Sequence, residues 1–374
     1  MKRQILIILL ALGFSCGANS QALTKQQMLE DYDYLVSFVE ENYAPFDAIM
    51  QKGYKREYKA LKKRLRKQLS NGEAELERTA TDYVLWFYSQ FDRHLWLEKT
   101  EAFQRAAGNL EIEAIMKIDS TLLTNQGNLE YDPKPVSCKV DSLTWLIRVP
   151  SCEPNFYDGT VNALQQFMAS DCENLIIDIR FNGGGGDNVW KKFYDLLYDH
   201  PGKPEISWHR NTPKNLLYWK EMLKLQPSSP WNLQLIETCE TSKKKFVKLG
   251  ESDNNREPTS RIKRAAVLID LYTASAAESL VKFVKNHSDR CKVYGICNTV
   301  GSNLTGNVRA ETLPNSRLDL VYATTVDSGF YEKDFSTEGL GIPPDVKIPL
   351  PFARKLTDNI DEWVLWVAKE MKNK

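Results

Sequence analysis

The sequence lacks the features that would point to a metal, nucleotide or nucleic-acid function. It has only four histidines, with no metal-ligand spacing and no His-Glu-x-x-His run, so we expect no metal and no other cofactor. Lysine and arginine total 49 and are balanced by 49 aspartates and glutamates. No overall basic field therefore favours nucleic acid or an anionic membrane surface. The sequence contains no internal repeat or low-complexity tract.

The N-terminus has the layout of an export signal. Lys2-Arg3 precede an apolar run and then small polar residues, which predicts a signal peptide over residues 1–20. Cleavage before Gln21 would release a soluble protein. Ser15-Cys16 also resembles a lipoprotein signal, in which Cys16 would carry a lipid and provide the only membrane attachment. We expect an exported protein that is periplasmic, outer-membrane-associated or extracellular.

Cysteine is scarce, and six of the seven lie beyond the signal. An even number in an oxidising compartment permits disulfides, but a chain of this length does not require them. Buried cysteines acting as small hydrophobic residues are the equal alternative. The six are Cys138, Cys152, Cys172, Cys239, Cys291 and Cys297.

The remaining chain divides into a helical part and an α/β part. Helical periodicity predicts an N-terminal helical domain over residues 21–98, opened by a capping box at Thr24 and Gln27. Residues 99–142 are a connecting segment. From residue 143 to 374, buried strands alternate with helices, which predicts a mostly parallel sheet covered by helices. A polar, proline-containing stretch at about 200–264 predicts a loop-rich insertion with one or two short helices.

A serine lies between a buried strand and an amphipathic helix. An apolar run over 265–271 ends just before Thr273, and the helix follows Ser275. Ala276 then has an unpaired N–H in the first helical turn, beside a hydroxyl that could attack a carbonyl. Ser275 is also suited to be a simple N-cap, since serine is favoured at that position.

A run of four glycines follows another buried strand at residues 175–181. Such a turn presents bare N–H groups that could hold a phosphate or an oxyanion. The phosphate interpretation requires a Gly-Lys-Ser/Thr or a spaced Gly-x-Gly-x-x-Gly pattern, and neither is present. An oxyanion hole that includes Gly183, Gly184 and Gly185 is favoured over a purely structural turn.

Four motifs in order resemble the S41 serine peptidases, the tail-specific or C-terminal processing proteases and their tricorn-like relatives. The resemblance implies a ClpP/crotonase-like α/β core and covers roughly residues 143–350. Asp92-Arg93-His94 also resembles the Asp-Gly-His that ends the helical domain in many members. The motifs are Asp178 to Gly185, Thr273 to Glu278, Thr299-Val300-Gly301, and Gly341 to Val346.

The sequence departs from the family pattern at two points. Members that use a Ser–Lys dyad have the lysine where this chain has Ser302. Lys282 and Lys285 follow the serine but are expected to point outward. The interval between His94 and residue 143 is also too short for the PDZ domain of the processing subgroup.

The resemblance to the tricorn-like subgroup implies that Ser275 is the nucleophile and His94 its base. A helix-terminal histidine with no catalytic role is the alternative for His94. Glu338 resembles the acidic member of the family, and Asp92 is a nearer rival. The expected substrate is a peptide or protein, with an oxyanion hole at Ala276 and the glycine turn. A non-catalytic peptide-binding protein and an esterase on the same fold remain open, as does the oligomeric state.

Overall fold

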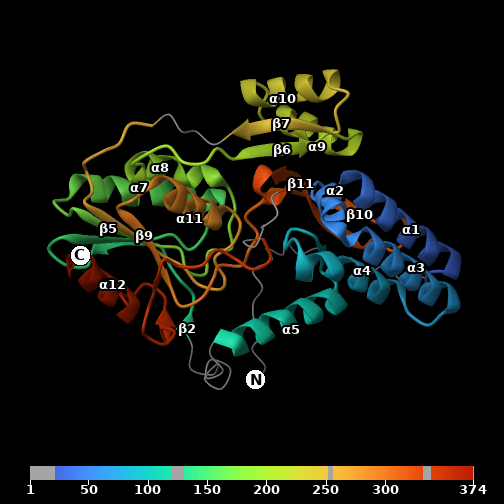
Figure 1. The fold of residues 1–374 in the computed structure, drawn as a ribbon, viewed down its shortest axis with the longest axis horizontal. Helices are drawn as coiled ribbons and strands as arrows, with labels where there is room; N and C mark the ends of the chain where they lie inside the picture. Colours follow the sequence, from blue (N-terminus) through green and yellow to red (C-terminus); the bar gives the residue numbers. More distant parts are fainter. Residues whose placement is uncertain (1–21, 119–129, 252–255, 332–337, 374) are drawn as a thin grey trace.

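The computed structural model describes residues 22–118, 130–251, 256–331 and 338–373. The expected signal peptide, including Cys16, lies outside these ranges. Figure 1 shows a bundle of N-terminal helices beside an α/β core, with a smaller group of helices and strands at the top. Within the described ranges, no helix has the length and apolar character needed to cross a membrane.

The N-terminal bundle begins at the predicted capping box. The Thr24 hydroxyl accepts the Gln27 N–H at 3.2 Å, and the Gln27 side chain accepts the Thr24 N–H at 2.9 Å. Gly72 ends the third α-helix in the left-handed conformation, which glycine adopts without strain. The helices are α1 (Lys25–Asn42), α2 (Phe46–Ile49), the π-helix η1 (Met50–Tyr54), α3 (Lys55–Asn71) and α4 (Leu76–Gln90).

The core of the α/β part is a six-stranded sheet in the order β12-β9-β8-β5-β4-β3. Only β3 runs antiparallel to its neighbour, so the expected mostly parallel sheet is confirmed. Strands β5 and β8 at its centre are short and almost wholly buried, as their continuous apolar runs predicted. The strands are β3 (Val136–Lys139), β4 (Thr144–Arg148), β5 (Asn174–Asp178), β8 (Arg264–Leu268), β9 (Cys291–Gly295) and β12 (Val346–Lys347).

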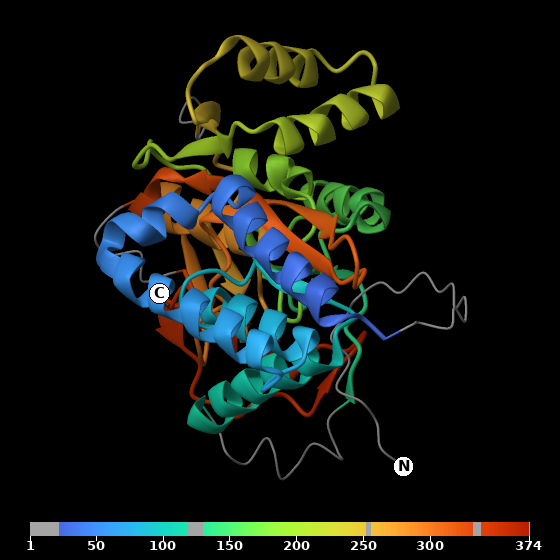
Figure 2. The same ribbon diagram turned by 90° about the vertical axis from the view of Figure 1, so that its right-hand side faces the viewer.

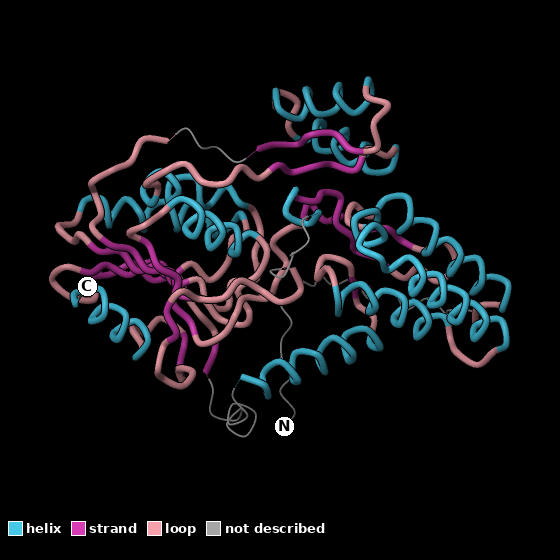
Figure 3. The backbone as a smooth tube through the Cα atoms, in the orientation of Figure 1, coloured by secondary structure: helices cyan, strands magenta, loops and turns pink. Residues whose placement is uncertain are grey.

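Helices cover both faces of this sheet, as Figure 3 shows. Ile147 and Ile177 point to the face covered by α7, α8 and α11. Their neighbours Leu146 and Ile176 point to the opposite face and pack under α12. The helices are α7 (Pro154–Ala169), the 3-10 helix η3 (Asp187–Trp190), α8 (Lys191–Leu197), α11 (Ala276–His287) and α12 (Glu362–Asn373).

A buried ion network ties this sheet to α12. Arg148 and Arg180 both bind Asp178 at 2.7 Å, and both also bind Asp361, which precedes α12. Each of the four side chains is at most 3% exposed, so breaking one partner would leave a buried charge unpaired. Asp178 and Arg180, which belong to one of the family-like motifs, thus have a structural role.

A second, antiparallel sheet joins the helical bundle to the α/β core. Strand β11 pairs with β10 on one side and with β1 and β6 on the other, and β7 pairs with β6. Residues of β11 share one hydrophobic core with α1, α3 and α4, and Leu304 and Leu313, on either side of β10, belong to the same core. The sequence did not predict this sheet. Its strands are β1 (Trp96–Glu98), β6 (Ile206–Arg210), β7 (Phe246–Glu251), β10 (Thr305–Thr312) and β11 (Asp319–Asp327).

The insertion at 200–264 is more regular than expected. One or two short helices were expected and two are present, α9 (Pro213–Leu225) and α10 (Pro230–Thr241), and strands β6 and β7 flank them. Trp219, Leu235 and Val247 form part of a small separate core. Figure 2 shows the two helices at the top, away from the parallel sheet. The other elements are α5 (Glu101–Ile118), which the sequence did not predict, the 3-10 helix η4 (Ser328–Tyr331), and β2 (Glu130–Tyr131) paired with β13 (Lys355–Leu356).

The six described cysteines are all free. Cys152, Cys172, Cys239 and Cys291 are buried, and burial raises the pKa of Cys152 to about 12. In the part of the chain that the structure describes, the cysteines therefore act as small hydrophobic side chains, one of the two alternatives left open by the sequence.

Candidate active site

Ser275 lies at the turn between β8 and α11, as its sequence context predicted. Its backbone has φ +53° and ψ −121°, a conformation that non-glycine residues rarely adopt. Such strain persists only where the surrounding structure enforces it, and it is concentrated at functional sites. The N–H of the next residue, Ala276, makes no hydrogen bond within the described ranges. The turn therefore presents a hydroxyl and an unused backbone donor side by side.

His94 approaches this hydroxyl from the N-terminal bundle. Helix α4 ends at Gln90, and the following turn places His94 in a position where it is 7% exposed. Its Nε2 lies 3.2 Å from Ser275 Oγ, although 181 residues separate the two in the chain. This distance is at the upper end of hydrogen-bond reach.

The other ring nitrogen of His94 contacts a residue that the sequence did not indicate. Thr305, the first residue of β10, has its Oγ1 2.7 Å from His94 Nδ1 and 2.7 Å from Asp92 Oδ1. The direct distance between Nδ1 and Asp92 Oδ1 is 3.6 Å. The threonine hydroxyl therefore lies between the imidazole and the carboxylate.

Asp92 is fully buried and richly hydrogen-bonded. Its Oδ1 also accepts the His94 N–H at 2.8 Å, and its Oδ2 accepts the hydroxyl of Tyr43 at 2.7 Å. Burial disfavours the charged form, but the interactions with His94 and Tyr43 outweigh it and lower the pKa of Asp92 below its ordinary value. Asp92 is therefore an anion at neutral pH.

Glu338 lies close to Asp92 and His94 but has different partners. Its Oε2 accepts the N–H groups of Asn303 at 3.0 Å and Leu304 at 2.6 Å, and its buried Oε1 has no hydrogen-bond partner among the described residues. Burial, followed by the charges of Asp92 and Glu278, raises the pKa of Glu338 well above its ordinary value. These surroundings favour the neutral acid.

Glu278 has a larger role than its place in the first turn of α11 suggested. Its buried carboxylate accepts the Ser275 N–H at 2.9 Å and the hydroxyl of Thr299. It also accepts the N–H groups of Gly301 and Ser302 and the Ser302 hydroxyl at 2.8–3.0 Å. One side chain thus joins the serine turn to the segment at 299–302.

Ser302, at the position of the family's dyad lysine, does not act as a base here. Its hydroxyl lies 3.0 Å from the Ser275 N–H, so that it supports the turn from the backbone side. The expectation that Lys282 points outward is wrong. Lys282 is largely buried and binds the Asn303 carbonyl, Asp327 and Glu205. Lys285 pairs with Asp345.

The glycine turn lies directly against Ser275. A Cβ added to Gly184 would lie 2.8 Å from Ser275 Cβ, so only glycine fits without a shift. The Gly184 N–H already donates to the Asn182 side chain at 2.9 Å, whereas those of Gly183 and Gly185 have no partner within the described ranges. Gly185 is close to Cys152, where a Cβ would lie 2.5 Å from the carbonyl carbon. The turn therefore offers two unused donors, at Gly183 and Gly185.

The side chains of Asp92, His94 and Glu338 come close enough together to hold a metal ion. One ligand atom from each lies within 4.8 Å of the others, and among the described residues this is the one such group of three. The spacing in the sequence gave no sign of it. Both oxygens of Asp92 and one of Glu338 already accept hydrogen bonds.

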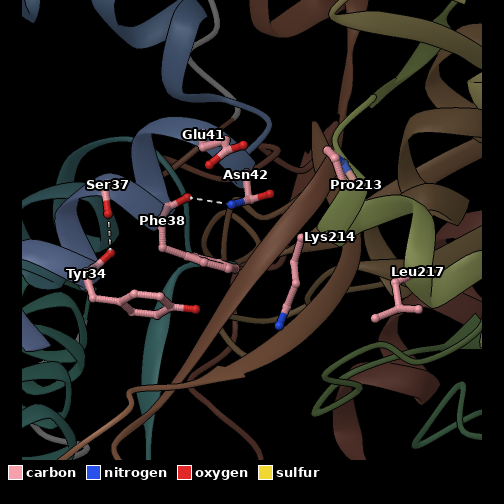
Figure 4. A pocket seen from close by; sticks show the side chains of 8 residues that line it. All are labelled: Tyr34, Ser37, Phe38, Glu41, Asn42, Pro213, Lys214 and Leu217. Carbon is pink, nitrogen blue, oxygen red and sulfur yellow. Dashed lines mark hydrogen bonds between the residues drawn. The ribbon is translucent and has the colours of Figure 1, made fainter.

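A separate groove of about 410 Å³ lies between α1 and α9 (Figure 4). It shares no lining residue with the Ser275 site. Lys214 within it pairs with Glu311, and Asn42 donates to the Phe38 carbonyl at 3.1 Å. The groove is lined by Tyr34, Ser37, Phe38, Glu41, Asn42, Pro213, Lys214 and Leu217.

The sequence of this chain matches a known protein family. Residues 144–348, more than half of the chain, match the family described as peptidase family S41. The chain belongs to peptidase family S41. The family predicted from the four motifs is therefore confirmed. Among curated proteins, no sequence matches this chain.

Several solved structures are similar to this S41 family member. Mature CPAF aligns with 87% of this chain and 93% of its own, at 13% identity and a TM-score of 0.58. Mature CPAF complexed with lactacystin aligns with 93% of this chain and 98% of its own, at 13% identity and a TM-score of 0.59. A lipoprotein from Streptococcus agalactiae has 15% identity over 97% of this chain and 99% of its own, with a TM-score of 0.48. The two alignments with mature CPAF confirm the expected ClpP/crotonase-like α/β fold with an N-terminal helical region.

Proposed function

We propose that this S41 family member is a serine peptidase that hydrolyses peptide bonds through an acyl-enzyme on Ser275, with His94 as general base. The observation that carries the proposal is the 3.2 Å contact between Ser275 Oγ and His94 Nε2. A serine hydroxyl is a weak nucleophile near neutral pH and needs a base at this distance. The strained backbone of Ser275 supports the same role.

The reaction would proceed by acyl transfer. As Ser275 Oγ attacks the peptide carbonyl carbon, its proton passes to His94 Nε2 and the carbonyl oxygen becomes an oxyanion. Collapse of this intermediate breaks the carbon–nitrogen bond, and the Nε2 proton passes to the leaving amine. Water then attacks the acyl-enzyme with His94 again as base, releasing the acid and restoring the Ser275 hydroxyl.

Two backbone donors are available for the oxyanion. The N–H of Ala276 supplies one, and the N–H of Gly183 or Gly185 supplies the other. Gly184 contributes by its lack of a side chain, since its own N–H is held by Asn182. Loss of one such donor typically lowers kcat by about 10²- to 10³-fold.

Asp92 is the better candidate for the acidic member of the site. It is anionic and reaches the imidazole through Thr305, whereas the surroundings of Glu338 favour its neutral form. An anion near Nδ1 stabilises the imidazolium that forms during catalysis. Glu338 would then support the chain at Asn303 and Leu304 rather than the charge.

We further propose that the enzyme belongs to the tricorn-like subgroup, which takes its base from the helical domain, and that it works after export. Ser302 in place of the lysine and the short interval between His94 and β4 support the subgroup. The signal-like residues 1–20 support export. The substrate would be a peptide or protein that reaches the site without a PDZ domain.

Labelling with a fluorophosphonate tests the proposal, because this probe reacts with an activated serine and requires no knowledge of the substrate. The wild type should label, Ser275→Ala should not, and His94→Ala should label about 10⁴-fold more slowly. Asp92→Asn should slow labelling strongly, and Glu338→Gln, which mimics the neutral acid, should slow it little.

Two outcomes would lead to other functions. A folded wild-type protein that does not label would indicate a non-catalytic peptide-binding protein. Labelling combined with turnover of ester but not peptide substrates would indicate an esterase on the same fold.

A further inference from the structure

The hydroxyl of Thr305 lies between the imidazole of His94 and the carboxylate of Asp92. The 3.6 Å separation of His94 Nδ1 and Asp92 Oδ1 is too long for a hydrogen bond, whereas Thr305 Oγ1 lies 2.7 Å from each. The interaction that orients the imidazole therefore passes through the threonine hydroxyl.

We infer that Thr305 is a positioning residue that fixes the tautomer of His94, leaving Nε2 unprotonated and able to accept the Ser275 proton. The inference rests on the proposed function, and it identifies a residue that neither the motifs nor the family comparison assigned. The inference follows from the number of protons that the side chains of His94, Thr305 and Asp92 have available for the hydrogen bonds between them.

The hydroxyl of Thr305 has one proton to donate. Asp92 is ionised and can only accept, so the hydroxyl proton points to Asp92 Oδ1. Thr305 must then accept a hydrogen bond from the imidazole, which requires a proton on Nδ1. Because a neutral imidazole carries a single N–H, Nε2 is left with a lone pair facing Ser275 Oγ.

The opposite tautomer would leave this arrangement unsatisfied. With the proton on Nε2, Nδ1 would need a donor, and the one hydroxyl proton of Thr305 would have to serve both Nδ1 and Asp92. Nε2–H would also face the hydroxyl of Ser275 as a donor and could not remove its proton. The arrangement therefore favours the productive tautomer without proton transfer through Thr305.

The protein holds the Thr305 hydroxyl in place from several directions. Thr305 pairs with Val326 of β11, and the preceding Asn303 and Leu304 donate to Glu338. A threonine is stiffer about χ1 than a serine, because its Cβ is branched. The carboxylate is held independently, since Tyr43 donates to its second oxygen.

The test uses Thr305→Val, which keeps the branched shape and removes the hydroxyl, and Thr305→Ser, which restores the hydroxyl. Nitrogen-15 NMR of the histidine rings, in full-length protein carrying Ser275→Ala, should show His94 with the proton on Nδ1. Adding Thr305→Val should shift the population toward Nε2–H or a mixture, whereas Thr305→Ser should keep the Nδ1–H form.

Labelling rates with a fluorophosphonate provide the second readout, in the protein with Ser275 intact. Thr305→Val should lower the rate by about 10²- to 10⁴-fold, and Thr305→Ser should recover it to within about tenfold of the wild type. Thr312→Val is the matched control, because Thr312 lies on the same strand and binds Asp319 outside the site. It should label like the wild type.

The outcomes separate this inference from the proposed function. If the wild type labels and Thr305→Val keeps both the rate and the His94 tautomer, the role of Thr305 is refuted while the peptidase proposal stands. If the wild type does not label, the peptidase proposal fails, and the tautomer measurement in the Ser275→Ala protein still decides the role of Thr305. A Thr305→Ser protein as slow as Thr305→Val would also refute it.

Discussion

The substitution Gly184→Ala tests whether the glycine turn sets the position of the nucleophile. The new Cβ would lie 2.8 Å from Ser275 Cβ, 3.0 Å from the Ala274 carbonyl oxygen and 3.1 Å from the Ala276 nitrogen. Two of these three contacts are to backbone, which cannot rotate away as a side chain does. The turn and the serine must therefore move apart.

The size of the movement follows from ordinary contact distances. Non-bonded carbon atoms pack at about 3.5–4.0 Å, so the Cβ of Ser275 must retreat by about 0.7–1.2 Å. A misplacement of about 1 Å at a reacting group lowers the rate by roughly 10²-fold, or about 2.7 kcal/mol in the activation barrier. The φ of +104° at Gly184 adds about 1–3 kcal/mol of strain to the folded state of the alanine variant.

The assay is the second-order rate of fluorophosphonate labelling, combined with thermal unfolding of the same samples. Gly186→Ala is the matched control, because Gly186 has a φ of −97° and its nearest atom to an added Cβ is the Cys152 oxygen at 3.8 Å. Gly184→Ala should label about 10²-fold more slowly while still unfolding cooperatively, and Gly186→Ala should match the wild type. A Gly184→Ala protein that labels at the wild-type rate would refute the steric argument.

Three further predictions concern buried carboxylates near the site. Glu278→Gln should lower the free energy of unfolding by about 2–3 kcal/mol in urea titrations and should slow labelling. The reason is that the new amide NH₂ would face backbone N–H donors that the carboxylate now accepts. Unchanged stability would contradict the hydrogen bonds described. Burial raises the pKa of Asp270 to about 6, so the wild type loses stability relative to Asp270→Asn as pH rises from about 4 to 6. The full loss is roughly 3 kcal/mol, from 1.36 kcal/mol per pH unit, and urea titrations at pH 4.5 and 7.5 should show about 2 kcal/mol of it; a pH-independent difference would contradict it. Asp178→Ala should cost about 3–5 kcal/mol, measured in the same way, since it leaves Arg148 and Arg180 without their shared partner; a loss below 1 kcal/mol would contradict this.

The sequence predicted those parts of the fold whose signals are local. The capping box at Thr24, the apolar runs of β5 and β8, and the amphipathic stripe of α11 each depend on neighbours within one element. The antiparallel sheet has no such signal. Strand β11 is buried along both faces and includes two buried threonines, Thr324 and Thr325, so it lacks the alternation that marks a half-buried strand.

The candidate site likewise has some residues that the sequence predicts and others that it does not. Ser275 and the glycine turn lie in short motifs, and His94 follows from the order of the motifs in the family. Thr305 and Tyr43 do not stand out, because threonine and tyrosine are common and their partners are distant in sequence. Thr305 lies 211 residues from His94, and Tyr43 lies 49 residues from Asp92. These groups come together because β11, which pairs with β10, packs in one hydrophobic core with α1 and α4.

The segment at 299–305 supports the proposal that this family member uses a histidine in place of the lysine. Thr299, Gly301 and Ser302 bind Glu278, which also accepts the Ser275 N–H. Asn303 and Leu304 bind Glu338, and Thr305 binds both His94 and Asp92. One short segment thus contacts Glu278 beside Ser275 at one end and His94 at the other. Because the proposed base, His94, comes from the N-terminal bundle, position 302 need not carry a lysine, and the Ser302 hydroxyl there donates to Glu278.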